Sequence, residues 1–109
     1  MDYAVDLMQT IGPVYAKSMF GGHGIFLDGL MFGLIARGTL YLKTDKALEN
    51  ELEARGLAAF TYNRKGKEFK MSYYQAPEEA LENEQVMKLW AGKAYSVALQ
   101  TVKESPKKK

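Results

Sequence analysis

Apolar and polar residues alternate along much of the first half of the chain, and short turn signals separate the alternating runs. Asp28-Gly29 suits the positive φ angles of a tight hairpin turn, and Arg37-Gly38 makes a second turn. A glycine-rich stretch, residues 21–24, interrupts the alternation earlier in the chain. The pattern predicts an antiparallel meander with strands at Val14–Phe20, Ile25–Leu27, Leu30–Ala36 and Thr39–Lys43.

The middle of the chain changes to a helical period and then returns to alternation. Thr44 or Asp45 can cap a helix of about three turns, and Gly56 can end it in the left-handed conformation. After this helix we expect a second hairpin, with strands Ala59–Arg64 and Lys67–Tyr74 around a Lys65-Gly66 turn. Its large side chains occupy alternate positions, at Phe60, Tyr62, Phe69, Met71 and Tyr73.

Helical patterns flank the strands at both ends of the chain. A short amphipathic helix fits Asp2–Ile11, and Gly12-Pro13 ends it. Near the other end, Pro77 fits the first turn of a helix and Asn83 can cap a longer one. The longer helix carries a continuous apolar stripe of Val86, Leu89, Trp90, Ala94, Val97 and Ala98.

This order of elements predicts an α+β fold in which a curved antiparallel sheet carries helices mainly on one face. One core suffices for 109 residues, so we expect one domain, residues 1–102, and a basic disordered tail, residues 103–109. An apolar second face of the sheet would favour dimerisation or protein binding. Alternation alone leaves open which large aromatics point inward among Tyr15, Phe26, Phe32, Tyr41, Tyr62 and Tyr74.

The composition narrows the classes of function. The absence of cysteine excludes disulfides and thiolate metal sites, and neither a signal peptide nor an apolar run of membrane-spanning length is present, so we expect the cytoplasm. The net charge is +2, but the basic tail carries +3, which leaves residues 1–102 with eleven basic and twelve acidic groups. A body so close to neutrality limits any nucleic-acid contact to a local surface.

His23 is the only histidine, and it lies in the glycine-rich stretch. Zinc needs three or four ligands, and no second histidine or cysteine is available to join His23. Residues 21–24 also lack the lysine and hydroxyl ending of a phosphate-binding loop, and a strand follows them in place of a helix. We therefore interpret these glycines as permitting a bend or bulge in a strand. We expect no catalytic residue, metal ligand or cofactor-binding residue.

The second hairpin mixes cations with aromatic residues, as hairpins that stack nucleic-acid bases do. Its candidate contacts to nucleic acid or to a partner are Arg64, Lys65, Lys67 and Lys70. Compared with the RNA-recognition signature, Lys67 replaces an aromatic residue and Glu68 replaces a small one. We therefore favour the alternative interpretation, in which the aromatics face inward and the lysines face solvent.

Several short blocks, in order and at compatible spacings, resemble the N-terminal domain of the TfoX/Sxy family of competence regulators. The resemblance runs from about residue 9 to about residue 99. The early blocks are Met19-Phe20-Gly21-Gly22, Gly24-Ile25, Gly29, Met31-Phe32 and Leu40-Tyr41-Leu42-Lys43. The later blocks are Phe60 with Tyr62, Lys65-Gly66-Lys67, Met71-Ser72-Tyr73-Tyr74, Pro77-Glu78 and Trp90-Ala91.

The resemblance implies a two-layer sandwich with a strongly curved antiparallel sheet, similar to that of type III secretion chaperones. It also implies a regulatory role without enzymatic activity in the expression of DNA-uptake genes. The implied protein partner is a transcription factor such as the cAMP receptor protein. Longer relatives carry a second, helical domain, and the sequence leaves open whether this chain is a stand-alone domain or part of a longer protein.

Three functional hypotheses follow from these observations. The first is a protein-interaction module that helps a transcription factor, with a homodimer as one further arrangement. The second is direct DNA binding through the hairpin, residues 62–74, and the lysine tail. The third, an enzyme or small-ligand binder near His23, rests on the glycine-rich stretch alone. A stand-alone domain with an unrelated regulatory role is the remaining alternative.

Overall fold

The computed structural model describes residues 2–19 and 22–104. The last helix includes residues 103 and 104 of the predicted tail, and residues 105–109 of that tail lie outside the described residues. The helices are α1 (Asp2–Met8), α2 (Lys46–Ala54) and α3 (Glu84–Glu104), with 3-10 turns η1 (Gln9–Ile11) and η2 (Glu78–Leu81). The strands are β1 (Tyr15–Met19), β2 (Gly22–Leu27), β3 (Leu30–Ala36), β4 (Thr39–Lys43), β5 (Ala59–Arg64) and β6 (Lys67–Gln75).

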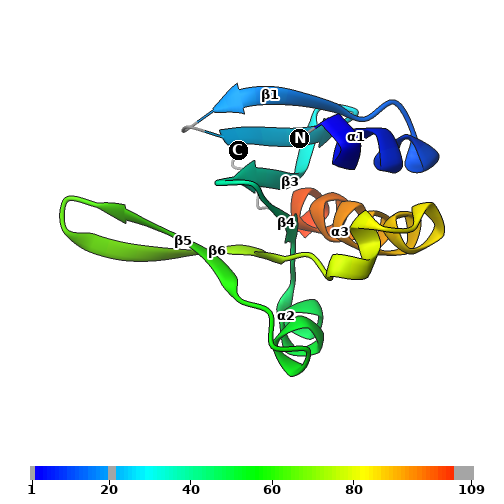
Figure 1. The fold of residues 1–109 in the computed structure, drawn as a ribbon. Helices are drawn as coiled ribbons and strands as arrows, with labels where there is room; N and C mark the ends of the chain where they lie inside the picture. The colour runs from blue at the N-terminus through cyan, green and yellow to red at the C-terminus, as the bar shows by residue number, and fades with distance from the viewer. Residues whose placement is uncertain (1, 20–21, 105–109) are drawn as a thin grey trace.

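The six strands form one sheet in the order β1-β2-β3-β4-β6-β5, and all neighbours are antiparallel. Figure 1 shows α3 running beside β3 and β4, with α1 near one end of α3 and α2 below β4. The buried side chains of these helices join those of the sheet in a single cluster. The predicted α+β fold with an antiparallel meander and a hairpin is confirmed, while its likeness to secretion chaperones stays a prediction.

Three of the connections are two-residue turns in which both residues have positive φ. They are Asp28-Gly29 (53° and 81°), Arg37-Gly38 (52° and 78°) and Lys65-Gly66 (53° and 80°). This geometry belongs to the hairpin turn whose twist matches that of the strands, and glycine tolerates the second position without strain. The predicted bounds of β3, β4 and β5 are confirmed, and the turns account for the ends of these strands that adjoin them.

Side chains cap the two longer helices as the sequence predicts. The Asp45 carboxylate accepts a hydrogen bond from the backbone N–H of Leu48 at 2.9 Å, and Gly56 follows α2 with a φ of 81°. The Asn83 Oδ1 accepts from the backbone N–H groups of Gln85 at 2.8 Å and Val86 at 3.2 Å. These bonds satisfy donors that the first turn of a helix leaves without partners.

The face of α3 that packs on the sheet consists mainly of small residues. Ala91, Ala94 and Ala98 are buried there together with Met87 and Trp90, so the helix backbone approaches the strands closely. The predicted stripe is thus confirmed at Trp90, Ala94 and Ala98, and the partly buried Val86 and Val97 pack against the same core. It is wrong at Leu89, whose side chain is 55% exposed, because it lies on the opposite side of the helix from the alanines.

The glycine-rich stretch is not a loop over its described part, because β2 begins at Gly22 and places His23 in the strand. A Cβ built on Gly22 would lie 2.1 Å from the backbone oxygen of Ile35, a separation that no side chain tolerates. Glycine at this position therefore lets β2 and β3 approach each other. The irregularity expected here occurs between Ile25 and Phe26, a short distance along β2.

The two ends of the chain depart in detail from their predicted elements. The predicted helix over residues 2–11 divides into α1 and the tighter turn η1, which Gly12 ends. Pro77 precedes the short turn η2 without starting an α-helix. None of the described helices has the length and apolarity needed to cross a membrane.

The close approach at Gly22 predicts a large loss of stability on substitution. Because the obstructing atom belongs to the backbone of β3, we expect Gly22→Ala to lower the free energy of unfolding by about 3 kcal/mol. The control is Gly92→Ala in α3, where no heavy atom other than those of the adjacent residues and the helix's own backbone lies within 4 Å of the added carbon. That variant should gain about 0.5–1 kcal/mol. Denaturant unfolding measures both, and equal stabilities for the two variants would contradict the close approach.

Candidate functional site

The sheet has one face toward the helices and one face away from them, which we call the outer face. Ile25, Ile35 and Leu42 belong to the core cluster, whereas the buried Leu34 lies outside it. Starting from these residues, the alternation of side chains along each strand and the register between strands assign every strand residue to one of the two faces. The outer face carries Tyr15, Lys17, Phe26, Leu34, Tyr41, Lys43, Phe60, Tyr62, Arg64, Lys67, Phe69 and Tyr73.

Aromatic side chains dominate this outer face. The rings of Tyr15 and Phe26 stack 5.6 Å apart across β1 and β2. A second row runs across β4, β5 and β6, with centroid distances of 5.1 Å from Tyr41 to Phe60, 6.4 Å from Phe60 to Tyr62 and 5.5 Å from Tyr62 to Phe69. Three of these side chains are well exposed, namely Tyr15 at 43%, Tyr62 at 38% and Phe69 at 41%.

The structure shows which of the large aromatic side chains point into the core and which lie on the outer face. Phe32 and Tyr74 point into the core, where the Phe32 ring packs edge to face with the Tyr95 ring of α3, with ring centroids 5.7 Å apart. The Tyr74 hydroxyl donates a hydrogen bond to the Glu53 carboxylate of α2, which explains how a tyrosine fills that core position. Tyr15, Phe26, Tyr41 and Tyr62 instead lie on the outer face. The sheet face without helices is therefore aromatic.

The outer face is also positively charged. The Nζ atom of Lys17 lies 5.7 Å from the centre of the Phe26 ring, and that of Lys43 lies 5.3 Å from the centre of the Tyr73 ring. Arg64 and Lys67 form a cross-strand pair beside the hairpin turn. In the described strands the only carboxylate is that of Glu68, which pairs with Asn63 on the other face.

The structure separates the four cations that the sequence singled out in the hairpin. Arg64 and Lys67 share the outer face, and Lys65 lies in the turn next to them. Lys70 is on the opposite face, where its Nζ lies 5.4 Å from the centre of the Tyr74 ring. The Tyr74 hydroxyl raises the pKa of Lys70, with smaller contributions from the carboxylates of α2. Lys70 therefore belongs with the Tyr74–Glu53 contact near α2.

The interpretation that the hairpin aromatics face inward is wrong for its outer half. Tyr62 and Phe69 are exposed on the outer face, and Tyr73 is on the same face although it is buried, so that only Tyr74 points into the core. Figure 1 shows the reason, because β5 and β6 extend beyond the layer formed by the helices. The sequence signal for this surface was the alternation of Phe60, Tyr62, Phe69 and Tyr73, which correctly placed these residues on one face.

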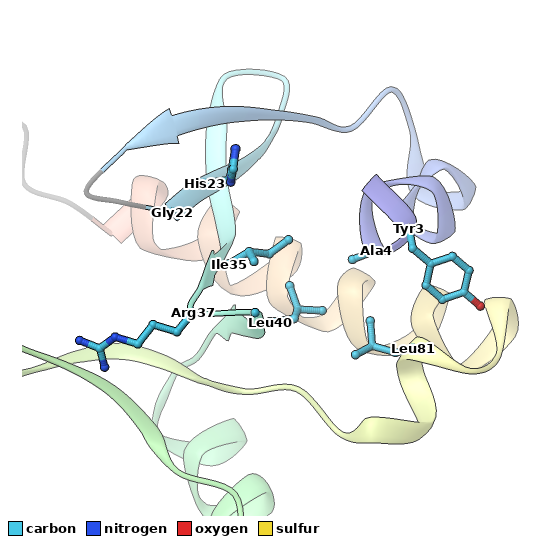
Figure 2. A pocket seen from close by; sticks show the side chains of 9 residues that line it. Tyr3, Ala4, Gly22, His23, Ile35, Arg37, Leu40 and Leu81 are labelled. Atoms are coloured by element: carbon cyan, nitrogen blue, oxygen red, sulfur yellow. The ribbon is translucent and has the colours of Figure 1, made fainter. Parts of the chain in front are cut away.

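His23 lies on the helix side of the sheet, beside an open groove of about 480 Å³. Figure 2 shows His23 near Ile35 and Leu40, with Tyr3 and Leu81 across the groove and the Arg37 side chain directed away from them. Among the described side chains that line the groove there is no carboxylate, no hydroxyl of serine or threonine and no second histidine. Across the described ranges, no group of three or more histidine, cysteine, aspartate or glutamate residues could hold a metal ion.

Comparison with known proteins gives a family match and several related proteins. The family model for the TfoX N-terminal domain matches residues 6–98. Protein Sxy of Escherichia coli is 24% identical over 79 residues, which cover 72% of this chain and 38% of that protein. DNA transformation protein TfoX of Haemophilus influenzae is 35% identical over 71 residues, which cover 64% of this chain and 33% of that protein.

A third relative has a similar extent of overlap. DNA transformation protein TfoX1 of Aliivibrio fischeri is 27% identical over 73 residues, which cover 67% of this chain and 35% of that protein. The chain therefore spans about a third of the length of these curated relatives.

The buried Tyr73 predicts a loss of stability in alkali. Burial raises the pKa of Tyr73 to about 12, above the ordinary value of 10.0, and its hydroxyl donates to the Met31 carbonyl at 3.4 Å. Since the unfolded chain releases this proton first, the contribution of Tyr73 to stability is complete below about pH 10 and is lost as the pH rises toward about 12.

We expect the free energy of unfolding of Tyr73→Phe to fall less than that of the wild type between about pH 9 and about pH 11. Denaturant unfolding at both pH values measures the difference. The pKa values of Tyr74 and Tyr95 are also raised, so the comparison with the variant isolates Tyr73. Equal losses in the two proteins would contradict the assignment.

Proposed function

Because the chain belongs to the TfoX N-terminal domain family, as its residues predicted, we propose that it is a regulatory domain that acts by binding, without catalysis. Two of its relatives are named DNA transformation proteins, which supports a role in the expression of DNA-uptake genes. The chain spans about a third of the length of these relatives. We therefore propose that this domain supplies one part of that role.

The observation that carries the proposal is an exposed apolar ridge on α3. Leu89 is 55% exposed and lies on the side of the helix opposite the buried alanines, and Leu99 is 42% exposed and lies on the flank between that side and the alanines. Gly92 and Ser96, at intermediate turns of the same ridge, add little bulk between them. Exposed leucines separated by small residues suit a protein partner that packs along the helix.

The proposed partner is a transcription factor such as the cAMP receptor protein, the kind of partner that the family resemblance implies. In this proposal the domain binds the factor through the α3 ridge and strengthens its hold on a promoter. The ridge is separate from the outer face, so contact with a protein leaves the aromatic surface accessible.

Direct binding of duplex DNA is the second candidate function. It is favoured by the position of Arg64, Lys65 and Lys67, which meet at the free end of the hairpin (Figure 1). Cations at a protruding end can reach backbone phosphates without obstruction by the body of the domain. This candidate predicts affinity for duplex DNA in the absence of a protein partner.

The test is a fluorescence anisotropy titration of a labelled duplex promoter fragment with the cAMP receptor protein, in the presence and absence of the domain. We expect the domain to lower the apparent Kd of the receptor by about tenfold, a typical coupling between two bound proteins. The double variant Leu89→Gln, Leu99→Gln should abolish this effect. The control variant Ala47→Gln, Ala54→Gln, which changes exposed apolar positions of α2, should keep it.

The remaining outcomes separate the two candidates. An unchanged receptor affinity in the presence of the wild-type domain would reject the proposed partner. Binding of the duplex by the domain alone, with an affinity that falls steeply with salt and with Arg64→Gln and Lys67→Gln, would favour direct DNA contact.

A further inference from the structure

The outer face of the sheet combines two features that the proposed protein contact leaves unused. Exposed aromatic rings extend from Tyr15 on β1 to Phe69 on β6, and cations lie among them. Lys17 and Lys43 already lie over aromatic rings of this face, at 5.7 Å and 5.3 Å from the ring centres. The surface is therefore apolar and cationic over the same area.

The charges of the outer face identify the class of ligand. Its four cations are Lys17, Lys43, Arg64 and Lys67, and the single carboxylate of the described strands points to the other side. Asp28, in the turn between β2 and β3, also faces away, because its Oδ2 accepts from the Tyr95 hydroxyl of α3 at 3.4 Å. A surface with this imbalance on a nearly neutral body is complementary to a polyanion.

The aromatic side chains distinguish between polyanions. Bases of a single strand expose their π faces and stack on tyrosine and phenylalanine, whereas a duplex buries these faces within its own stack. Tyr62 and Phe69, at 38% and 41% exposure, are available for such stacking. A second copy of the chain is a poor ligand for the same face, because its four cations would meet those of the first copy.

The dimensions of the face agree with a short single strand. Five interstrand spacings separate β1 from β5, and at about 4.8 Å each they span roughly 24 Å. That length accommodates about four nucleotides, the lower end of site sizes for sheet-based binders of single strands.

We propose that the outer face binds single-stranded DNA, with bases stacked on its exposed aromatic side chains and phosphates held by Lys17, Lys43, Arg64 and Lys67. The choice of DNA over RNA rests on the proposed role in DNA-uptake gene expression, while the stacking and the charge contacts rest on the surface itself. Lys70 takes no part, because it lies on the opposite face near Tyr74.

The test is an anisotropy titration of a labelled oligothymidylate of about twelve nucleotides with the full chain, at about 50 mM and about 200 mM salt. Four phosphate contacts predict a slope of log affinity against log salt of about −2.8. We expect the same sequence annealed to its complement to bind about tenfold more weakly, because pairing removes the bases from stacking.

Two pairs of variants separate the aromatic and the charge contributions. Tyr62→Ala with Phe69→Ala should weaken binding by about tenfold or more and leave the salt slope unchanged. Arg64→Gln with Lys67→Gln should reduce the magnitude of the slope by about 1.4. The control, Lys46→Gln with Lys88→Gln, removes two exposed lysines of α2 and α3 and should change neither quantity. Circular dichroism establishes that each variant is folded.

Several results would overturn the proposal. These are duplex binding as tight as single-strand binding, RNA binding at least about tenfold tighter than DNA binding, and an affinity insensitive to Tyr62→Ala with Phe69→Ala. The Leu89→Gln, Leu99→Gln variant distinguishes this inference from the proposed function, because it should keep full single-strand affinity. Loss of the receptor effect alone would reject the co-regulator proposal, and loss of single-strand binding alone would reject the outer-face proposal.

Discussion

The packing of α3 against β3 and β4 is the contact on which the rest of the structure depends. A helix whose inner face is largely alanine lies close to the strands, and Trp90 and Met87 fill the remaining space. Both α1 and α2 then add side chains to the same core, since Ala4, Leu48 and Leu52 belong to its cluster. All the helical cover is therefore on one side, and the sheet must stabilise its other side alone.

The outer face achieves this through contacts among its own side chains. Leu34 and Tyr73 are buried although they lie outside the core cluster, and the Lys43 side chain lies over the Tyr73 ring. Tyr73 also reaches across β4 to the Met31 carbonyl of β3. The outermost rings, those of Tyr62 and Phe69, stack on each other and remain in contact with solvent.

The sequence predicted the elements well because their ends depend on local chemistry. Turns such as Asp28-Gly29 need positive φ at adjacent residues, and caps such as Asp45 need one acceptor, so both can be recognised within a few positions. The need for glycine at position 22 could not be recognised in this way, because it arises from the backbone of Ile35, which lies in another strand.

The candidate surfaces were less predictable than the fold. Alternation correctly grouped Phe60, Tyr62 and Phe69, but it could not tell which side the helices cover, since that depends on where α2 and α3 pack. Alternation does separate Lys67 from Lys70, because they are an odd number of residues apart in one strand, but it could not say which of the two lies on the face with the helices. The exposed Leu89 was hidden for a related reason, because a leucine beside Trp90 resembles a core residue until the helix has a known orientation.

The part of the hairpin beyond the helix layer has solvent on both of its faces, with residues 62–70 all exposed. Its length is therefore not constrained by the core. Adding two residues to each strand would keep every side chain on its original face and extend the ribbon by roughly 7 Å. Adding one residue would exchange the two faces and move the cations away from the rings. Evolution can thus lengthen this arm in steps of two while the domain behind it remains unchanged.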